Sequence, residues 1–277
     1  MQLLRLTLLL AASAFAAAQS PPPSLWQMQE SGATAGLRGI DSVDDTVAWA
    51  SGTNGTVLKT IDGGAHWTQC AIPDADKDGA TLDLRGVQAW DAKTAIVMAS
   101  GKGSLSRLYK TTDGCFHWKI LLYNPEKEGF WDTLYFPPRD DGKGIGNGGW
   151  LLGDPVGGRF WLLHSYDRGD HWTKQIGKGM EAEASQQGIF AASNSNVINH
   201  LYWPFFITGG KAGTQINSIE SSRICLDACT PKESNFDGKW DKWKQIALPI
   251  ENGTESWVPS PLMQSQTIPT ASSTTPL

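Results

Sequence analysis

TIDGGAHW, at residues 60–67, is the first of three similar stretches that decide the fold of this chain. The second is TTDGCFHW at residues 111–118, and the third is SYDRGDHW at residues 165–172. All three follow the pattern Ser/Thr-x-Asp-x-Gly-x-x-Trp, except that Cys115 replaces the glycine in the second copy. Asp113 lies 51 positions after Asp62, and Asp167 lies 54 positions after Asp113. A period of about fifty residues is typical of the blades of a β-propeller.

The residues around these stretches repeat as well, in short apolar runs. Leu-Arg-Gly opens the first two units, at residues 37–39 and 84–86. A second and a third apolar run follow in each unit, and a last strand is expected to begin at the tryptophan. Each unit is therefore predicted to be four short strands joined by turns. The strands predicted for the third unit are residues 131–136, 150–153, 159–165 and 172–176.

A fourth unit is recognisable, but it matches the repeat pattern less completely than the first three. Its strands are expected at residues 188–192, at residues 201–208 and from Trp243 onward. Residues 25–27 resemble the strands that follow the repeated stretches, although no such stretch precedes them. The prediction is an all-β, β-propeller domain over residues 19–256, made of four-stranded antiparallel blades with about four recognisable. The ring is expected to be incomplete, and the chain to be a C-terminally truncated or frameshifted form.

The two ends of the chain are expected to lie outside this domain. Residues 1–18 contain one arginine, a short apolar run and an alanine-rich stretch, which is the pattern of a secretory signal peptide cleaved after Ala18. The mature protein is therefore predicted to be secreted or periplasmic, and no later segment is apolar for long enough to span a membrane. Residues 257–277 are rich in Ser, Thr and Pro and are expected to be a disordered tail.

Composition and charge narrow the class of partner. The formal net charge is −5, so the chain lacks the basic surface that nucleic-acid binding requires. No phosphate loop, dinucleotide fingerprint or zinc signature is present, so no cofactor is expected. The 13 tryptophans and 30 glycines suit many short strands joined by tight turns.

Four cysteines in an exported chain favour disulfides over a metal site. Cys225 and Cys229 are close enough in sequence to close a local loop, which would leave Cys70 to pair with Cys115. Cys70 follows the first repeated stretch and Cys115 lies inside the second, so a bridge between neighbouring units is plausible. Four cysteines allow three pairings, and the alternatives stay open.

The three stretches resemble the Asp-box turn, also called the bacterial neuraminidase repeat (BNR). Such turns occur in sialidases, some glucanases, sortilin-type receptors and photosystem II stability/assembly factors. The Leu-Arg-Gly openings, WASGTNG at residues 49–55 and LKT at residues 58–60 are similar to the photosystem II stability/assembly factor-like group. The resemblance covers roughly residues 25–253. It implies a β-propeller of the sialidase-like superfamily and a role in binding or assembly, in photosynthesis or in exported proteins of other bacteria.

The acidic residues of the repeats are interpreted as structural and not as catalytic. An aspartate in a turn accepts backbone N–H bonds, and the tryptophan five positions later packs against its blade. These residues are Asp62, Trp67, Asp113, Trp118, Asp167 and Trp172. Because each pair belongs to a different blade, the carboxylates are expected to be too far apart to share an active site. Asp74, Asp76 and Asp78 match the start of a calcium loop, but Arg85 stands where its bidentate glutamate should be.

The candidate binding residues are Arg38 and Arg85, which open the innermost strands of the first two units. A guanidinium there can bind a carboxylate of a protein partner in a bidentate manner. In the photosystem II assembly factors, arginines on the propeller contact the partner, which is the role that the resemblance implies here. Asp132 holds the corresponding place in the third unit and breaks the pattern. The first hypothesis for the protein is a non-enzymatic scaffold that binds an unidentified protein. The alternative is a sialidase-like glycoside hydrolase or glycan-binding module. For the two arginines, the alternative to partner binding is an ion pair with a neighbouring aspartate.

Overall fold

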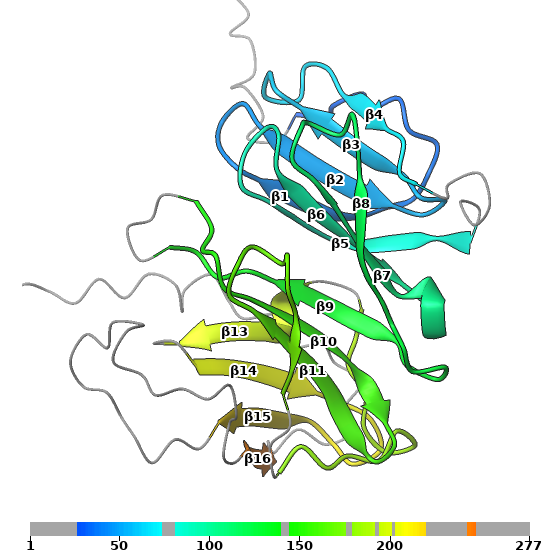
Figure 1. The fold of residues 1–277 in the computed structure, drawn as a ribbon, viewed down its shortest axis with the longest axis vertical. Helices are drawn as coiled ribbons and strands as arrows, with labels where there is room; N and C mark the ends of the chain where they lie inside the picture. The colour runs from blue at the N-terminus through cyan, green and yellow to red at the C-terminus, as the bar shows by residue number, and fades with distance from the viewer. Residues whose placement is uncertain are drawn as a thin grey trace, which may run out of the picture.

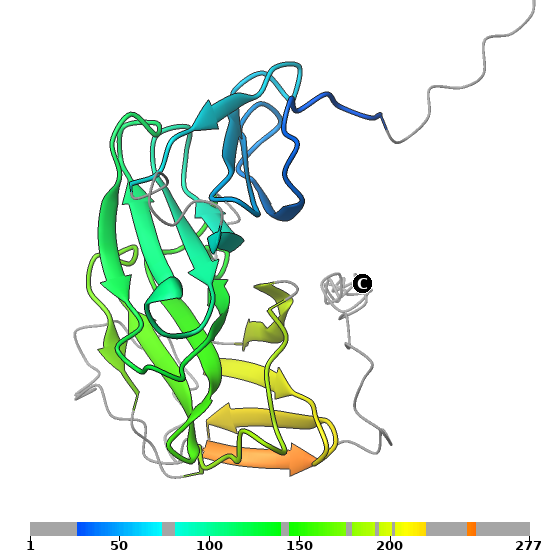
Figure 2. The same ribbon diagram turned by 90° about the vertical axis from the view of Figure 1, so that its right-hand side faces the viewer.

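Four consecutive antiparallel sheets make up the fold. The computed structural model describes residues 27–73, 81–139, 144–175, 179–191, 194–200, 203–219 and 243–247. Within these residues each sheet contains four strands, paired in the order in which they occur along the chain. The sheets follow one another along an arc that stays open between the first and the fourth (Figures 1 and 2). The prediction of an all-β fold made of four-stranded, propeller-like blades is therefore confirmed.

The sheets contain the following strands. The first has β1 (Leu37–Ser42), β2 (Ala48–Gly52), β3 (Val57–Thr60) and β4 (Thr68–Cys70). The second has β5 (Asp83–Ala89), β6 (Ala95–Ser100), β7 (Arg107–Thr111) and β8 (Lys119–Tyr123). The third has β9 (Trp131–Tyr135), β10 (Gly149–Val156), β11 (Arg159–Ser165) and β12 (Thr173–Lys174). The fourth has β13 (Val197–His200), β14 (Trp203–Thr208), β15 (Gln215–Ile219) and β16 (Trp243–Ala247).

Helical structure in these residues is limited to short 3-10 turns. They include η2 (Gly103–Leu105), which lies between β6 and β7, and η3 (Asn194–Asn196), which precedes β13. None of the helices in the described ranges is long and apolar enough to cross a membrane.

The strands predicted for the fourth unit were wrong in part. The first strand is β13 and not residues 188–192, and β15 has no counterpart in the prediction. Ile189 is buried, but its N–H donates to the Asp154 carboxylate instead of to a neighbouring strand. Of the residues described in this run, only Gly188 makes a β-bridge, with Gly209, and Phe190 is 45% exposed. β15 escaped notice because its sequence, QINSI, is largely polar.

Each junction between two consecutive sheets is an apolar layer, to which each sheet contributes one of its faces. The front face of a sheet is the face that packs on the following sheet, and its rear face is the face that packs on the preceding sheet. The first layer joins the front face of the first sheet, with Trp49 and Val57, to the rear face of the second, with Val87 and Val97. The second and third layers repeat this arrangement. Their members include Ile96, Leu108, Leu134 and Leu151 in the second layer and Leu152, Leu162, Val197 and Phe206 in the third.

The glycine of each Leu-Arg-Gly opening allows the innermost strands to approach closely. A Cβ added to Gly39 would lie 2.9 Å from the backbone oxygen of Arg85, on the innermost strand of the next sheet. A Cβ on Gly86 would lie 3.3 Å from the Cβ of Leu134, again on the next innermost strand. Contacts this short force a shift, so a larger side chain would push neighbouring sheets apart.

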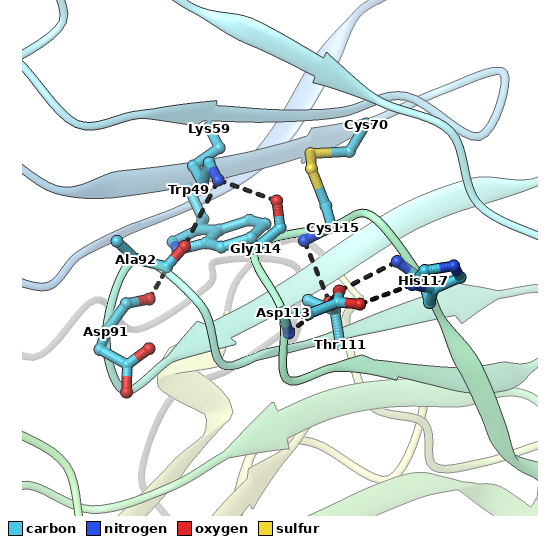
Figure 3. The surroundings of a disulfide bond; sticks show 10 residues. All are labelled: Trp49, Lys59, Cys70, Asp91, Ala92, Thr111, Asp113, Gly114, Cys115 and His117. Carbon is cyan, nitrogen blue, oxygen red and sulfur yellow. Dashed lines mark hydrogen bonds and ion pairs between the residues drawn. A yellow bond between two sulfur atoms is a disulfide. The ribbon is translucent and has the colours of Figure 1, made fainter.

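A lysine from each of the first two sheets binds the turn of the next sheet. Lys59 Nζ donates to the carbonyl oxygen of Gly114 at 2.8 Å, as Figure 3 shows. Lys110 Nζ donates in the same way to the carbonyl oxygen of Arg168 at 3.0 Å. Both lysines precede the Ser/Thr that begins a repeated stretch. In the third sheet this place is taken by His164, which is buried and whose pKa burial lowers to about 4.

Candidate functional site

Arg38, Arg85 and Asp132 hold the same place on three successive innermost strands, and that place is a β-bulge. In the first sheet Leu37 pairs with Gly52 and Gly39 with Ser51, so Arg38 has no partner on β2. The ladder skips Arg85 between Leu84 and Gly86, and it skips Asp132 between Trp131 and Thr133. A bulge redirects the side chain of its extra residue. The backbone therefore presents these three side chains as a set.

The two arginines converge on one carboxylate, that of Asp83. Arg38 Nε lies 3.3 Å from Asp83 Oδ1, and Arg85 Nε lies 2.8 Å from Asp83 Oδ2. The side chains of Arg38 and Arg85 remain 47% and 31% exposed. This is the pairing with a neighbouring aspartate that the sequence left open. Two guanidinium groups and one carboxylate leave one positive charge in excess, which is partly accessible to a partner.

Arg85 is held by further contacts. Its Nη1 donates to the carbonyl oxygen of Ala191 at 3.2 Å, and its guanidinium lies 5.9 Å from the ring centre of Phe130. A guanidinium so placed loses little conformational freedom when it binds an anion. Arg38 is more exposed, and its side-chain ion pair with Asp83 crosses from the first sheet to the second. The two arginines therefore differ in exposure while sharing one counter-ion.

Asp132 lies beneath the surface, with 3% of its side chain and backbone area exposed. Burial, and then the nearby carboxylate of Asp154, raise its pKa to about 9, although the charge of Arg85 opposes this shift. Its Oδ2 atom has no hydrogen-bond partner among the described residues. Asp132 is therefore neutral at pH 7 and does not cancel the charge of the arginines. Its burial also removes it from direct contact with a partner, contrary to the role predicted for it.

Two acidic residues of this site were missed by the sequence analysis. Asp83 stands two residues before Arg85, a spacing that places both side chains on one side of a strand, and this signal was available. Asp154 carried no signal, because only the fold brings it near β9. Its N–H donates to the carbonyl oxygen of Phe130, and its Oδ1 accepts the N–H of Ile189 at 2.9 Å.

The aspartates of the repeated turns are engaged within their own turns. Asp62 Oδ1 accepts the backbone N–H of His66 at 2.9 Å and the hydroxyl of Thr60 at 2.8 Å. Its Oδ2 lies 2.7 Å from His66 Nδ1. Asp113 and Asp167 repeat all three contacts with His117 and His171 and with the hydroxyl residue two positions earlier.

These contacts stabilise the charged form of the aspartates. The backbone N–H of the histidine, followed by its side chain, lowers the pKa of Asp62 and of Asp113 to about 2. The three carboxylates lie on three different sheets, each with its own partners. This arrangement matches a structural role at the turns.

The tryptophans of the repeats extend from these turns into the layers between sheets. Trp118 packs against the first layer, and its ring centre lies 6.3 Å from that of Trp49, edge to face. Trp172 packs against the second layer, at 6.0 Å from the ring of Phe136. Trp67 is half-buried at the first turn. In the second and third sheets, the tryptophan side chain thus connects the repeated turn to the apolar layer between sheets.

Cys70 and Cys115, the pair inferred from the sequence, form a disulfide (Figure 3). It joins β4 of the first sheet to the repeated turn of the second sheet. Cys115 occupies the place of the glycine and has a φ of 71°, a left-handed conformation that glycine adopts more readily. The replacement of glycine in this copy is therefore explained by the bond that its side chain makes.

Several predictions fall outside the described residues. These are the signal peptide at residues 1–18, the tail at residues 257–277, the calcium-loop candidate at Asp74, Asp76 and Asp78, and the pair Cys225 and Cys229. Within the described residues there is no group of three or more His, Cys, Asp or Glu side chains that could hold a metal ion.

Comparisons with known proteins identify similar structures but no family. No protein-family model matches the chain, and no curated protein matches it. A solved structure of YCF48 bound to D1 peptide is 15% identical over 81% of this chain and 56% of that one, with a TM-score of 0.48. YCF48 from Cyanidioschyzon merolae is 17% identical over 71% of this chain and 70% of that one, with a TM-score of 0.31.

A glycoside hydrolase is similar to the same degree. The GH74 xyloglucanase from Xanthomonas campestris is 12% identical over 68% of this chain and 27% of that one, with a TM-score of 0.40. The chain thus spans little more than half of the YCF48 chain in complex and about a quarter of the xyloglucanase. Because the similar structures include a peptide-binding protein and a hydrolase, we base the functional proposal on the residues of this chain.

Proposed function

We propose that this protein is an exported, non-enzymatic β-propeller scaffold, similar in kind to photosystem II stability/assembly factors. It binds a protein partner through Arg38 and Arg85. The observation that carries the proposal is the convergence of two bulged arginines on one carboxylate, with a partly exposed positive charge left over. The complementary group is a carboxylate of the partner, from an acidic side chain or a chain terminus, because the planar guanidinium binds carboxylates with paired hydrogen bonds.

The neutrality of Asp132 supports this proposal. An ionised carboxylate beside Arg85 would compete with an incoming anion, whereas the raised pKa of Asp132 keeps its proton in place at pH 7. The overall net charge of −5 makes a local positive site more selective, because the surrounding surface repels anions that make no specific contacts.

Export is part of the same proposal. The disulfide between Cys70 and Cys115 suits an oxidising compartment, in which structural disulfides persist. The signal-peptide pattern of residues 1–18 leads to the same compartment.

A peptide-binding experiment tests the arginine site. A library of acidic peptides, each made with a free and with an amidated C-terminus, is screened against the exported protein by fluorescence anisotropy. For peptides that bind, we expect Arg38→Ala and Arg85→Ala each to weaken binding by about tenfold or more, because a charge-assisted hydrogen bond contributes about 1.5–3 kcal/mol. Arg85→Lys keeps the charge but loses the planar fork, and should recover only part of the affinity.

Lys119→Ala is the matched control, because it removes an exposed cation from β8, at the opposite edge of the second sheet from β5. The control should leave the affinity unchanged. Equal losses in the control and in the arginine variants would show that only net charge matters. Turnover of a fluorogenic glycoside that a single acidic substitution abolishes would contradict the non-enzymatic assignment.

A further inference from the structure

A short segment between the third and fourth sheets forms one side of the arginine site. The carbonyl oxygen of Ala191, in this segment, accepts the N–H of Arg85 Nη1 at 3.2 Å. Phe190, one residue earlier, is 45% exposed. Because consecutive Cα atoms are about 3.8 Å apart, Phe190 lies close to the group that Arg85 binds. An exposed aromatic residue therefore borders the positive charge of the site.

The backbone of this segment is held on both sides of Phe190. Gly188 exchanges two backbone hydrogen bonds with Gly209, at 2.8 and 3.0 Å. The side chain of Ile189 is buried in the layer between the third and fourth sheets. The carbonyl oxygen of Phe190 accepts the side-chain amide of Asn196. A ligand that packs on Phe190 therefore does not have to order the backbone that carries it, which lowers the cost of binding.

A second phenylalanine lies against the guanidinium of Arg85. The ring centre of Phe130 is 5.9 Å from the guanidinium carbon, and Phe130 is half-buried. Phe130 precedes β9, and its carbonyl oxygen accepts the N–H of Asp154 at 2.9 Å. Phe130 therefore supports Arg85 from the fold, whereas Phe190 presents more of its apolar surface to a ligand.

The two arginines keep hydrogen-bond donors for a ligand. A guanidinium carries five N–H donors. Arg38 and Arg85 each use Nε for Asp83. Arg85 also uses one N–H of Nη1 for Ala191. In the part of the chain that the structure describes, the remaining donors of both groups have no acceptor. A carboxylate can therefore bind here without displacing Asp83.

We propose that the arginine site recognises a segment in which a large apolar side chain stands two residues from the carboxylate. This inference rests on the proposed function and adds a second feature to the ligand. The carboxylate binds the arginines, and the apolar side chain packs on Phe190. In an extended peptide, side chains two residues apart lie on the same face, about 6.6 Å from one another. Both groups of the segment therefore face the site together.

The apolar contact gives the site a selectivity that its charge alone does not. Carboxylates occur on the surface of most proteins, and the exposed donors of the arginines accept any of them. An apolar side chain gains free energy when it moves from water onto the ring of Phe190. Discrimination between partners is a difference between two binding free energies, so this contact favours segments that carry both groups.

Fluorescence anisotropy with three matched peptides tests this inference on the full chain. Each peptide has blocked ends and a serine-rich sequence around one central residue. The first has a central glutamate with leucine two positions away on both sides, the second has serine in place of the leucines, and the third has glutamine in place of the glutamate. We expect the first to bind about fivefold more tightly than the second, because leucine covers part of an exposed ring. The third should bind about tenfold more weakly than the first, because it lacks the carboxylate.

Substitution of Phe190 separates the apolar contact from the charge. Phe190→Ala should abolish the preference for leucine and leave the affinity for the serine peptide unchanged. Phe190→Leu keeps an apolar side chain and should retain most of the preference. Phe116→Ala is the control, because Phe116 is 84% exposed in the repeated turn between β7 and β8, and it should change neither affinity. Circular dichroism should show an unchanged fold for all three variants, since both phenylalanines are exposed.

The outcomes distinguish this inference from the proposed function. Equal binding of the leucine and serine peptides would overturn the inference alone, and so would a leucine preference that survives Phe190→Ala. If no peptide with a carboxylate binds, or if Arg38→Ala and Arg85→Ala leave binding unchanged, the proposed function fails and this inference fails with it.

Discussion

At the scale of the residue, Arg38, Arg85 and Asp132 lie at equivalent bulges of three sheets but differ in exposure and charge. The guanidinium groups remain partly exposed and share Asp83 as counter-ion, whereas Asp132 is buried beside Asp154. A buried carboxyl group avoids the cost of burying a charge by keeping its proton. The exchange of arginine for aspartate in the third sheet therefore leaves the site positive and adds a pH-sensitive group beneath it.

Asp132 should make the protein less stable as the pH rises. The folded pKa of about 9 lies above the value of 3.8 for an unperturbed aspartate, so the stabilisation by its bound proton is complete below about pH 4. This stabilisation is lost progressively as the pH rises toward 9. Asp132→Asn keeps the shape without the ionisation and should become more stable than the unmodified protein above neutral pH.

Urea unfolding at pH 5 and at pH 8 measures this effect. The stability difference between Asp132→Asn and the unmodified protein should grow with pH, by at most about 1.4 kcal/mol for each pH unit. Asp45→Asn, at an exposed aspartate of the first sheet, is the control and should show no such growth. Parallel stability profiles for Asp132→Asn and the unmodified protein would contradict the buried, protonated state.

At the scale of the element, the repeated turns hold neighbouring sheets together through contacts of different kinds. Tryptophans pack from the turn into the apolar layer, lysines reach from one sheet to the turn of the next, and a disulfide crosses the first junction. The second junction has the lysine contact with an added ion pair, between Lys110 and Asp170 at 2.7 Å.

Loss of the Lys110 contact should loosen the junction between the second and third sheets. The Lys110 side chain is 7% exposed, so its bonds to the Arg168 carbonyl and to Asp170 are largely shielded from water. We expect Lys110→Met to destabilise the protein by about 1.5–3 kcal/mol, the usual contribution of hydrogen bonds to charged groups. Hydrogen exchange should rise most at residues 165–172, and exposed Lys93→Met should change neither quantity. Uniform exchange over all sheets would contradict a local contact.

The disulfide should contribute a larger share of stability at the first junction. It closes a loop with a sequence separation of 45 residues, and a crosslink over such a loop stabilises a protein by about 2–4 kcal/mol. The double variant Cys70→Ser with Cys115→Ser should lose about this amount in urea unfolding. A reductant should destabilise the unmodified protein and leave the double variant unchanged. If reduction destabilises both equally, the effect does not arise from this bond.

At the scale of the whole molecule, the open arc leaves two faces of opposite kind at its ends. Closure is the means by which all-β repeat folds cover such faces and edges. Among the described residues, the front face of the fourth sheet has no following sheet packed on it, whereas Ala50 and Leu58 on the rear face of the first sheet are buried.

Export is also a property of the whole molecule. We expect the secreted or periplasmic protein to begin at Gln19, because small residues precede that position in the manner of a signal-peptidase site. Mass spectrometry of the protein purified from the periplasm or the medium checks this directly. A mature chain that keeps residues 1–18 would contradict the prediction.

The regular repeats were predictable because their chemistry is local. The turns at residues 60–67, 111–118 and 165–172, and the strands on either side, follow from periodicity and turn residues within a few positions of each other. The fourth sheet was predicted less well, because β15 is largely polar and the apolar residues 188–191 make only one β-bridge, at Gly188. Burial there comes from contacts across the fold, which periodicity does not report.

The sequence by itself therefore determined the all-β class, the four-stranded unit and the equivalent positions of Arg38 and Arg85 in the first two units. Only the tertiary structure decided how these residues act. The bulges, the sharing of Asp83 and the buried proton of Asp132 depend on pairing between strands and on groups from other sheets. A charge state or a ladder irregularity is set by the neighbours that folding brings together, and these are separated along the chain by tens of residues.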